Sequence, residues 1–230
     1  MEIFDSLIKE VSEIIEPYSK TEYSYEKENS WEDVGHNQVI LQKETLFELD
    51  GVGFNLLTSS HIDDSVVVIG KDLQDLKKNS KFARICFIEF EEGEDIQKTY
   101  NLIRKIEYTK YHFFPDGYMI RTSAKAHKES VRVSKTAVKK GISFQKIGNI
   151  LIRKFKENPA VKGVKVVFVT EDAVDFSVLE SLSRKNHEIT ETLNQVMNNL
   201  TFDCDTCNLK AICDEVEGMR ELHFKSSMGK

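Results

Sequence analysis

The stretch GVKVVFVT, residues 163–170, is an apolar run rich in β-branched residues, which is typical of a buried strand. On its N-terminal side we predict an amphipathic helix that begins at Ser143 and ends before Pro159. On its C-terminal side we predict a longer helix from about Val174 to Asn198. The residues expected to face inward are Phe144, Ile147, Leu151 and Phe155 in the first helix and Val178, Leu182, Ile189, Leu193 and Val196 in the second. A strand between two helices predicts an α/β fold.

Further strands are predicted from Gln38 onward, where short apolar runs are separated by Gly, Asp, Asn and Ser. The runs are QVILQ, TLFELDG, FNLLTS, SVVVIG and FARICFIEF. SVVVIG and RICFIEF are largely apolar, which favours central strands covered on both faces. A helix is expected at about 95–110, and a short one, KTAVKK, between an N-cap at Ser134 and a stop at Gly141. We therefore expect a mixed sheet flanked by helices.

An amphipathic helix is also predicted at the N-terminus, where Pro17 ends it. Its apolar positions are Ile3, Phe4, Leu7, Ile8, Val11, Ile14 and Ile15. Residues 18–37 are polar with scattered aromatic residues and no clear period, which predicts a linker or a loosely packed arm. We expect three parts: the N-terminal helix and linker (1–37), an α/β domain (38–200) and a cysteine-rich tail (201–230).

The composition is that of an ordinary folded protein, with 40% apolar residues, 30% charged residues and only three prolines among 230 residues. No apolar run approaches the roughly 20 residues that a bilayer span needs, and the acidic, amphipathic N-terminus is unlike a cleaved signal. We therefore expect a cytoplasmic protein without membrane contact. The net charge of −6 argues against a nucleic-acid partner, which would need a basic surface.

Three of the four cysteines lie close together in CDTCNLKAIC, residues 204–213. In a reducing compartment, cysteines at such short spacing indicate metal ligands or redox groups rather than structural disulfides. The candidate metal ligands are Cys204, Cys207 and Cys213. The acidic residues around them disfavour a nucleophilic thiolate, whereas a bound cation would relieve the repulsion. We therefore expect a metal site, with thiol redox chemistry or thiols without a role as the alternatives.

Three thiolates leave one coordination position to be filled from elsewhere. An iron–sulfur cluster with another group on its fourth iron, or a zinc ion completed by His223 or by a partner chain, would satisfy this pattern. In a helical tail His223 would lie roughly 15 Å of helix rise beyond Cys213, which makes direct co-ligation depend on a bend. Cys86 lies within a predicted strand, where we expect a buried small side chain rather than a ligand.

The stretch VRVSKTAVKKGISFQKIGNILIRKFKENPAVKGVKVVFVTEDA, residues 131–173, resembles acetyl-CoA synthase, the beta subunit of the carbon monoxide dehydrogenase/acetyl-CoA synthase complex. Weaker similarity runs upstream, so that the resemblance covers roughly residues 39–207. In that family the corresponding region is the middle α/β domain and the entry to the catalytic domain. There a Cys-x-x-Cys pair begins the ligand set of the nickel–iron–sulfur cluster, and Cys204 and Cys207 correspond to that pair.

The sequence departs from this family after the cysteine pair. The family has two further cysteines at wider spacings and a later Cys-Gly-Cys that completes the nickel site, whereas Cys213 follows Cys207 after only five residues and no Cys-Gly-Cys occurs here. We therefore expect a truncated or accessory relative that is not active alone. The resemblance implies anaerobic one-carbon metabolism and a corrinoid protein or a carbon monoxide dehydrogenase subunit as partner, and a homo-oligomer is left open. The alternative is a non-catalytic interaction module with structural zinc.

A basic segment, residues 121–141, stands out in this acidic protein because its only acidic residue is Glu129. The candidate cofactor-binding residues are Arg121, Lys125, Lys128 and Arg132. Guanidinium and ammonium groups bind phosphate oxygens, and the resemblance implies coenzyme A as the ligand. No glycine-rich phosphate loop accompanies them, which favours a solvated face of a helix–loop segment. For Phe113, Phe114 and Tyr118 we expect packing in the core rather than stacking on an adenine.

Overall fold

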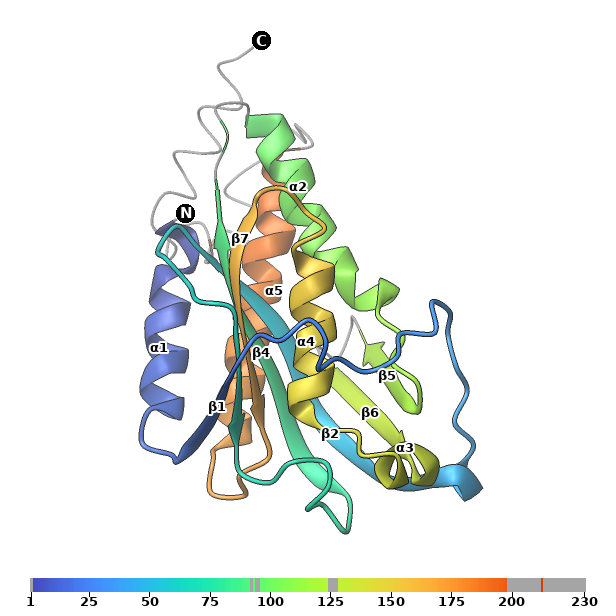
Figure 1. Ribbon diagram of the computed structural model, residues 1–230. Coiled ribbons are helices and arrows are strands. Elements are labelled where there is room, and N and C mark those ends of the chain that lie inside the picture. Colours follow the sequence, from blue (N-terminus) through green and yellow to red (C-terminus); the bar gives the residue numbers. More distant parts are fainter. Residues whose placement is uncertain (1, 92, 94–95, 124–127, 198–211, 213–230) are drawn as a thin grey trace.

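The computed structural model describes residues 2–91, 93, 96–123, 128–197 and 212. In this part of the chain seven strands form one sheet in the order β1-β3-β7-β4-β2-β6-β5, which confirms the α/β prediction (Figure 1). The strands are β1 (Lys20–Ser24), β2 (Thr45–Thr58), β3 (Ser65–Ile69), β4 (Ser80–Phe90), β5 (Tyr118–Ser123), β6 (Lys128–Ser134) and β7 (Val161–Val169). The α-helices are α1 (Asp5–Ile15), α2 (Ile96–Tyr108), α3 (Lys135–Lys139), α4 (Phe144–Phe155) and α5 (Phe176–Met197). Short 3-10 helices are η1 (Glu2–Phe4), η2 (Gln42–Glu44) and η3 (Thr109–His112).

The sheet is mixed, as the sequence predicts. β2 pairs with β4 and β3 pairs with β7 in parallel, whereas the other four ladders are antiparallel. Every residue of β3 is buried, and β4 is buried over most of its length. The two strands predicted to be central are thus covered on both faces, because apolar side chains on both faces of a strand are stable only where both faces are shielded from water.

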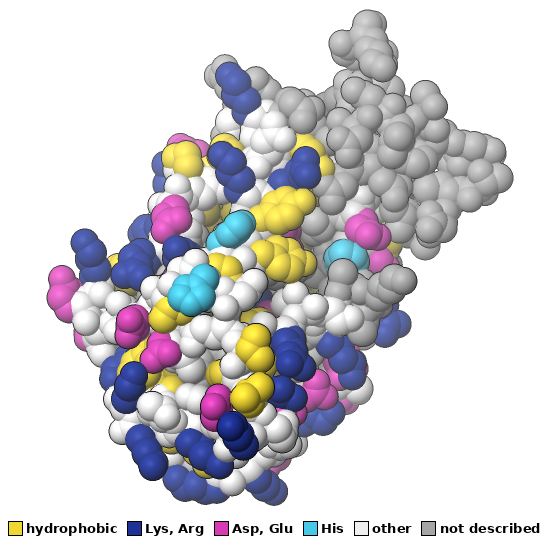
Figure 2. All heavy atoms as spheres, turned by 90° about the vertical axis from the view of Figure 1, so that its right-hand side faces the viewer, with side chains coloured by type: hydrophobic (Ala, Val, Ile, Leu, Met, Phe, Trp, Pro, Cys, Tyr) yellow, Lys and Arg dark blue, Asp and Glu magenta, His cyan; other side chains and the backbone are white. Residues whose placement is uncertain are grey.

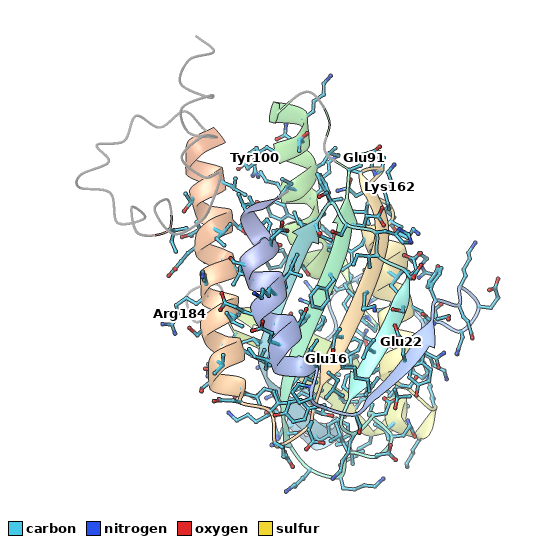
Figure 3. The ribbon with its side chains drawn as sticks, turned by 90° about the vertical axis from the view of Figure 1, so that its left-hand side faces the viewer. Glu16, Glu22, Glu91, Tyr100, Lys162 and Arg184 are labelled. Carbon is cyan, nitrogen blue, oxygen red and sulfur yellow. The ribbon has the colours of Figure 1, made fainter. Side chains whose placement is uncertain are left out.

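Helices cover both faces of the sheet. α4 packs on β3 and β7, while α1 and α5 lie side by side on the opposite face (Figures 1 and 3). Under α4 the aromatic rings of Phe82, Phe144 and Phe168 stack, with the centroids of the last two 4.5 Å apart. At the far end of the central strands, Lys162 and Glu91, labelled in Figure 3, form an ion pair of 2.6 Å. α2 lies next to the part of the sheet that contains β2 (Figure 1).

The predicted helix ends agree with the capping geometry. The Ser134 hydroxyl accepts a hydrogen bond from the Ala137 amide at the start of α3, and the Ser143 hydroxyl accepts one from the Lys146 amide at the start of α4. Gly141 follows α3 with φ of +84°, a left-handed conformation that side chains disfavour. These caps set the start of α3, directly after β6, and the start of α4, which packs over the core.

Several predicted elements are wrong. QVILQ does not form a strand: the backbone amide of Ile40 donates to the sulfur of Met119, and Gln42 begins η2. TLFELDG and FNLLTS are parts of the single strand β2. The basic segment is not a helix–loop segment in residues 121–123 and 128–133, because β5 and β6 form an antiparallel ladder there.

The predicted linker contains β1, which pairs with β3 along residues 20–24. β1 is an edge strand with exposed side chains, so it carries little of the apolar alternation that marks a strand in the sequence. In α5, Val178 is exposed (39%) and Leu179 takes the inward position instead. Among the described residues, no helix is both long enough and apolar enough to span a membrane. Of the cysteine-rich tail, only Ile212 is described.

Candidate functional site

A polar layer is buried in the sheet where β4, β2 and β6 lie side by side. Arg84 of β4 is 2% exposed and Glu129 of β6 is 1% exposed. The Nε and Nη2 atoms of Arg84 donate to the two carboxylate oxygens of Glu129, at 2.9 and 2.8 Å. Between them lies Gly53 of β2, where a Cβ atom would stand 2.0 Å from Glu129 Oε2. A glycine at this position therefore makes the room in which the ion pair crosses the middle strand.

The same guanidinium group extends the layer toward α2. Arg84 Nη1 donates to the side-chain oxygen of Asn55 at 3.2 Å and to the sulfur of Cys86 at 3.1 Å. Asn55 Nδ2 in turn donates to Glu107 of α2 at 3.1 Å. A continuous chain of polar contacts thus runs from the buried Glu129 to the carboxylate of Glu107.

Burial and charge act against each other in this layer. Burial alone would lower the pKa of Arg84, but the Glu129 carboxylate more than offsets it and the pKa is raised, so the arginine stays charged. Burial raises the pKa of Cys86 to about 11, although Arg84 partly opposes the shift. Cys86 is therefore a buried, protonated thiol at neutral pH, which confirms the expectation of a buried small side chain. Burial, followed by the charge of Glu129, also raises the pKa of Tyr118.

A pocket of about 70 Å³ lies next to the polar layer. It lies where β2 runs on past its ladder with β6: that ladder ends at the Gly51–Glu129 pair, whereas β2 continues to Thr58. β2, α2, η3, the β5–β6 hairpin and α5 all contribute to its walls. Its polar side chains include Glu107, Tyr111, Ser123, Lys128, Ser183 and Asn186. Residues far apart in the sequence therefore meet at one edge of the sheet.

Asn186 is an unusual member of this wall. It lies in the inward stripe of α5 together with Leu182 and Ile189, and it is only 3% exposed. Among the described residues its Oδ1 atom has no hydrogen-bond partner. An unsatisfied buried polar atom costs roughly 1–3 kcal/mol, so a polar side chain at a position suited to leucine needs a reason beyond stability.

The structure brings three of the four predicted basic residues onto one face of the β5–β6 hairpin. Arg121 lies opposite Ser130, and Lys128 and Arg132 are its diagonal neighbours. Arg132, however, is held by Glu48, with Nε to Oε1 at 2.6 Å. Lys125 lies outside the described residues. Figure 2 views the side of the molecule that carries the hairpin and shows acidic side chains interspersed among the lysines and arginines.

The predicted metal ligands Cys204, Cys207 and Cys213 lie outside the described residues, as does His223. Within the residues that are described, no group of three or more His, Cys, Asp or Glu side chains could hold a metal ion. Phe113 and Tyr118 are buried in the core as expected, whereas Phe114 is only half-buried.

The buried layer has signals in the sequence that periodicity and motif spacing do not capture. Arg84 interrupts the apolar run FARICFI within β4, and Glu129 is the single acid of the basic segment. Asn186 likewise interrupts an apolar helical stripe. A charged or amide side chain at an inward position is the signal that marks such groups, because burial of a polar group requires a partner.

No curated protein matches this chain. A family does match it: that of the CO dehydrogenase/acetyl-CoA synthase complex beta subunit, over residues 36–174. The matched range contains the strands β2 to β7 and with them the Arg84–Glu129 pair, but it stops before α5 and before the cysteines. More than half of the chain is matched, and the resemblance noted in the sequence is thereby confirmed up to residue 174. This chain belongs to the family of the CO dehydrogenase/acetyl-CoA synthase complex beta subunit.

Proposed function

We propose that this protein is an accessory relative of acetyl-CoA synthase in one-carbon and acetyl-CoA metabolism, and that it carries an iron–sulfur centre on Cys204, Cys207 and Cys213. The observation that carries the proposal is the family match over residues 36–174, which spans most of the sheet and the polar layer within it. The family is named for a complex, which supports a CO dehydrogenase subunit or a corrinoid protein as the partner. Catalysis of acetyl-CoA formation by this chain alone is not part of the proposal.

The donor set suits an iron–sulfur centre. Three thiolates at Cys-x2-Cys-x5-Cys spacing are soft ligands, and they leave one iron position for an outside group. No Cys-Gly-Cys occurs in residues 1–230, and the proposal does not include a nickel site. Ile212, the residue before Cys213, is 7% exposed and belongs to the apolar core. The residue next to Cys213 therefore belongs to the folded body.

Coenzyme A is the ligand that we propose for the basic residues of the hairpin. The exposed side chains of Arg121 and Lys128 support this, since their charges are accessible to a phosphate group. Lys125, from the stretch between β5 and β6, would add a third cation. The ion pair between Arg132 and Glu48 counts against a direct role for Arg132, because a phosphate would have to displace a carboxylate at 2.6 Å.

Metal and sulfide analysis together with absorption spectra, on protein purified without oxygen, tests the metal centre. We expect iron with inorganic sulfide and a brown colour, and we expect a Cys207→Ser variant to lose most of both. A Cys86→Ser variant is the matched control, because Cys86 is buried beside Arg84 and should leave the metal content per folded molecule unchanged. Zinc without visible absorbance would favour the structural zinc module, and an unchanged metal content in Cys207→Ser would refute the ligand assignment.

A further inference from the structure

The pocket beside β2 carries opposite charges on different walls. Lys128 is the first residue of β6 and is exposed, while Glu107 belongs to the last turn of α2 and accepts a hydrogen bond from Asn55. Both side chains line the pocket. A simple anion there would be attracted by the Lys128 ammonium group but repelled by the Glu107 carboxylate. A simple cation would be attracted by Glu107 but repelled by Lys128. The charges therefore complement a ligand that carries both signs.

The third recognition element is the carboxamide of Asn186. Its unpartnered oxygen accepts hydrogen bonds and cannot donate one, so it requires an N–H or O–H group from its surroundings. A ligand ammonium group has three such donors, enough for both Asn186 Oδ1 and Glu107. The hydroxyl groups of Ser183 and Ser123, which line the same pocket, are able to donate to a ligand carboxylate beside Lys128.

The volume of the pocket limits the size of the ligand. About 70 Å³ is well below the roughly 300 Å³ at which pockets for drug-sized ligands begin, so a nucleotide does not fit. We propose that this pocket binds a small zwitterion of the α-amino acid class, with its carboxylate toward Lys128 and its ammonium group toward Asn186 and Glu107. The argument uses no residue of the cysteine segment, so this inference does not rest on the metal centre proposed above, and it shares only Lys128 with the coenzyme A proposal.

Titration of the full-length chain with small probes, followed by NMR chemical shifts, tests the ligand class. Glycine is the probe of choice, and acetate, methylamine and acetamide each lack part of its charge pattern. We expect glycine to bind at least about tenfold more tightly than each of the other three, because a lost charged contact in a partly buried site costs about 1.4 kcal/mol or more. Acetate binding as tightly as glycine would show a plain anion site, and no response to glycine would show no amino acid site; either result overturns the proposal.

Variants separate recognition from folding. Asn186→Leu fits the apolar stripe of α5, so we expect it to weaken glycine binding at least about tenfold while raising the thermal unfolding midpoint. Lys128→Ala should also weaken glycine binding but change acetamide binding little. Lys139→Ala, which removes an exposed lysine of α3 outside the pocket, is the charge-matched control and should bind glycine as the wild type does. Wild-type glycine affinity in both Asn186→Leu and Lys128→Ala would refute the inference. If Asn186→Leu fails to fold, Lys128→Ala alone tests it.

Discussion

The two halves of the sheet, which share β4, are filled with different chemistry. In the half made of β3, β7 and β4, the side chains under α4 are apolar, with Val66 and Phe168 fully buried. In the half made of β4, β2 and β6, Arg84 and Glu129 occupy equally buried positions. Apolar burial stabilises by roughly 25 cal/mol per Å², whereas a buried ion pair roughly offsets its own desolvation. Apolar packing, to which Leu49, Leu56 and Val133 of the second half also contribute, therefore supplies the stability of the fold, whereas the Arg84–Glu129 pair fixes side chains without adding to it.

The largest effect is expected where the polar half loses one charge. Glu129→Ala leaves the Arg84 guanidinium buried without its carboxylate, and we expect a loss of about 3–5 kcal/mol in the free energy of unfolding. Denaturant unfolding measures the change. Glu48→Ala is the matched control, since it removes the partner of Arg132 from a much more exposed ion pair and should cost no more than about 1 kcal/mol.

A paired replacement sharpens the same comparison. If Arg84→Met and Glu129→Leu are combined, the polar half becomes apolar and we expect the stability to return to the wild-type value or above it. Equal small losses for Glu129→Ala and Glu48→Ala would instead mean that the buried pair is well hydrated and that the two halves do not differ.

The apolar half is sensitive to volume rather than to charge. At Gly148 of α4 an added Cβ would lie 2.4 Å from a methyl group of Val66, so Gly148→Ala must push the helix away from β3. We expect a loss of about 1–3 kcal/mol from overpacking, reduced by the better helix propensity of alanine. Unfolding of the variant by urea measures it, and glycine binding at the distant pocket should not change.

Val66→Ala provides the partner for a double-mutant cycle. Each single change should destabilise, and the double variant should recover part of the loss because the smaller side chain makes room for the new methyl group. Additive losses would show that Gly148 is required for a reason other than its contact with Val66.

The same contrast explains what the sequence could predict. β3, β4 and β7 are apolar runs and the caps at Ser134 and Ser143 are local, so periodicity and turn chemistry were sufficient to find them. β1 and β5 are the edge strands of the sheet and β6 lies beside β5, and all three have many exposed or half-buried side chains, so the apolar pattern fades there. β1 pairs with β3 and β6 pairs with β2, and a single sequence does not reveal such pairings between strands that are far apart along the chain.

The candidate site was hidden for a related reason. Arg84 and Glu129 are 45 residues apart in the sequence, and only the register of β2 between β4 and β6 brings them together. Asn186 reaches the pocket from α5, beyond the range of the family match. The cysteines, by contrast, form a local motif that is visible directly in the sequence, although the described residues do not include them. Local motifs are thus visible in a sequence, whereas a site assembled by a sheet edge is not.

The smallest effect is expected from an exposed charge cluster at the end of β4. The ring of His61 lies 3.2 Å from Asp63 and 3.0 Å from Glu89, and the hydrogen bond to Asp63, followed by the charge of Glu89, raises the pKa of His61. A raised folded-state pKa stabilises the protonated form, so this contribution is fully present below the unfolded value of 6.5 and is lost as the pH rises through the folded-state value.

The test is the thermal midpoint of wild type and His61→Gln as the pH rises from about 5.5 to 8. Across this pH range the thermal midpoint of the wild type should fall slightly relative to that of the variant. Added salt should shrink this difference because the cluster is exposed. The Arg84–Glu129 pair should contribute nothing to this slope, since the pKa of Arg84 is raised from a value already far above the range. Identical slopes for the two proteins would show that His61 does not gain from its carboxylates. If the pH dependence of the thermal midpoint instead disappears in the double variant Arg84→Met, Glu129→Leu, the pH response originates in the polar half of the sheet.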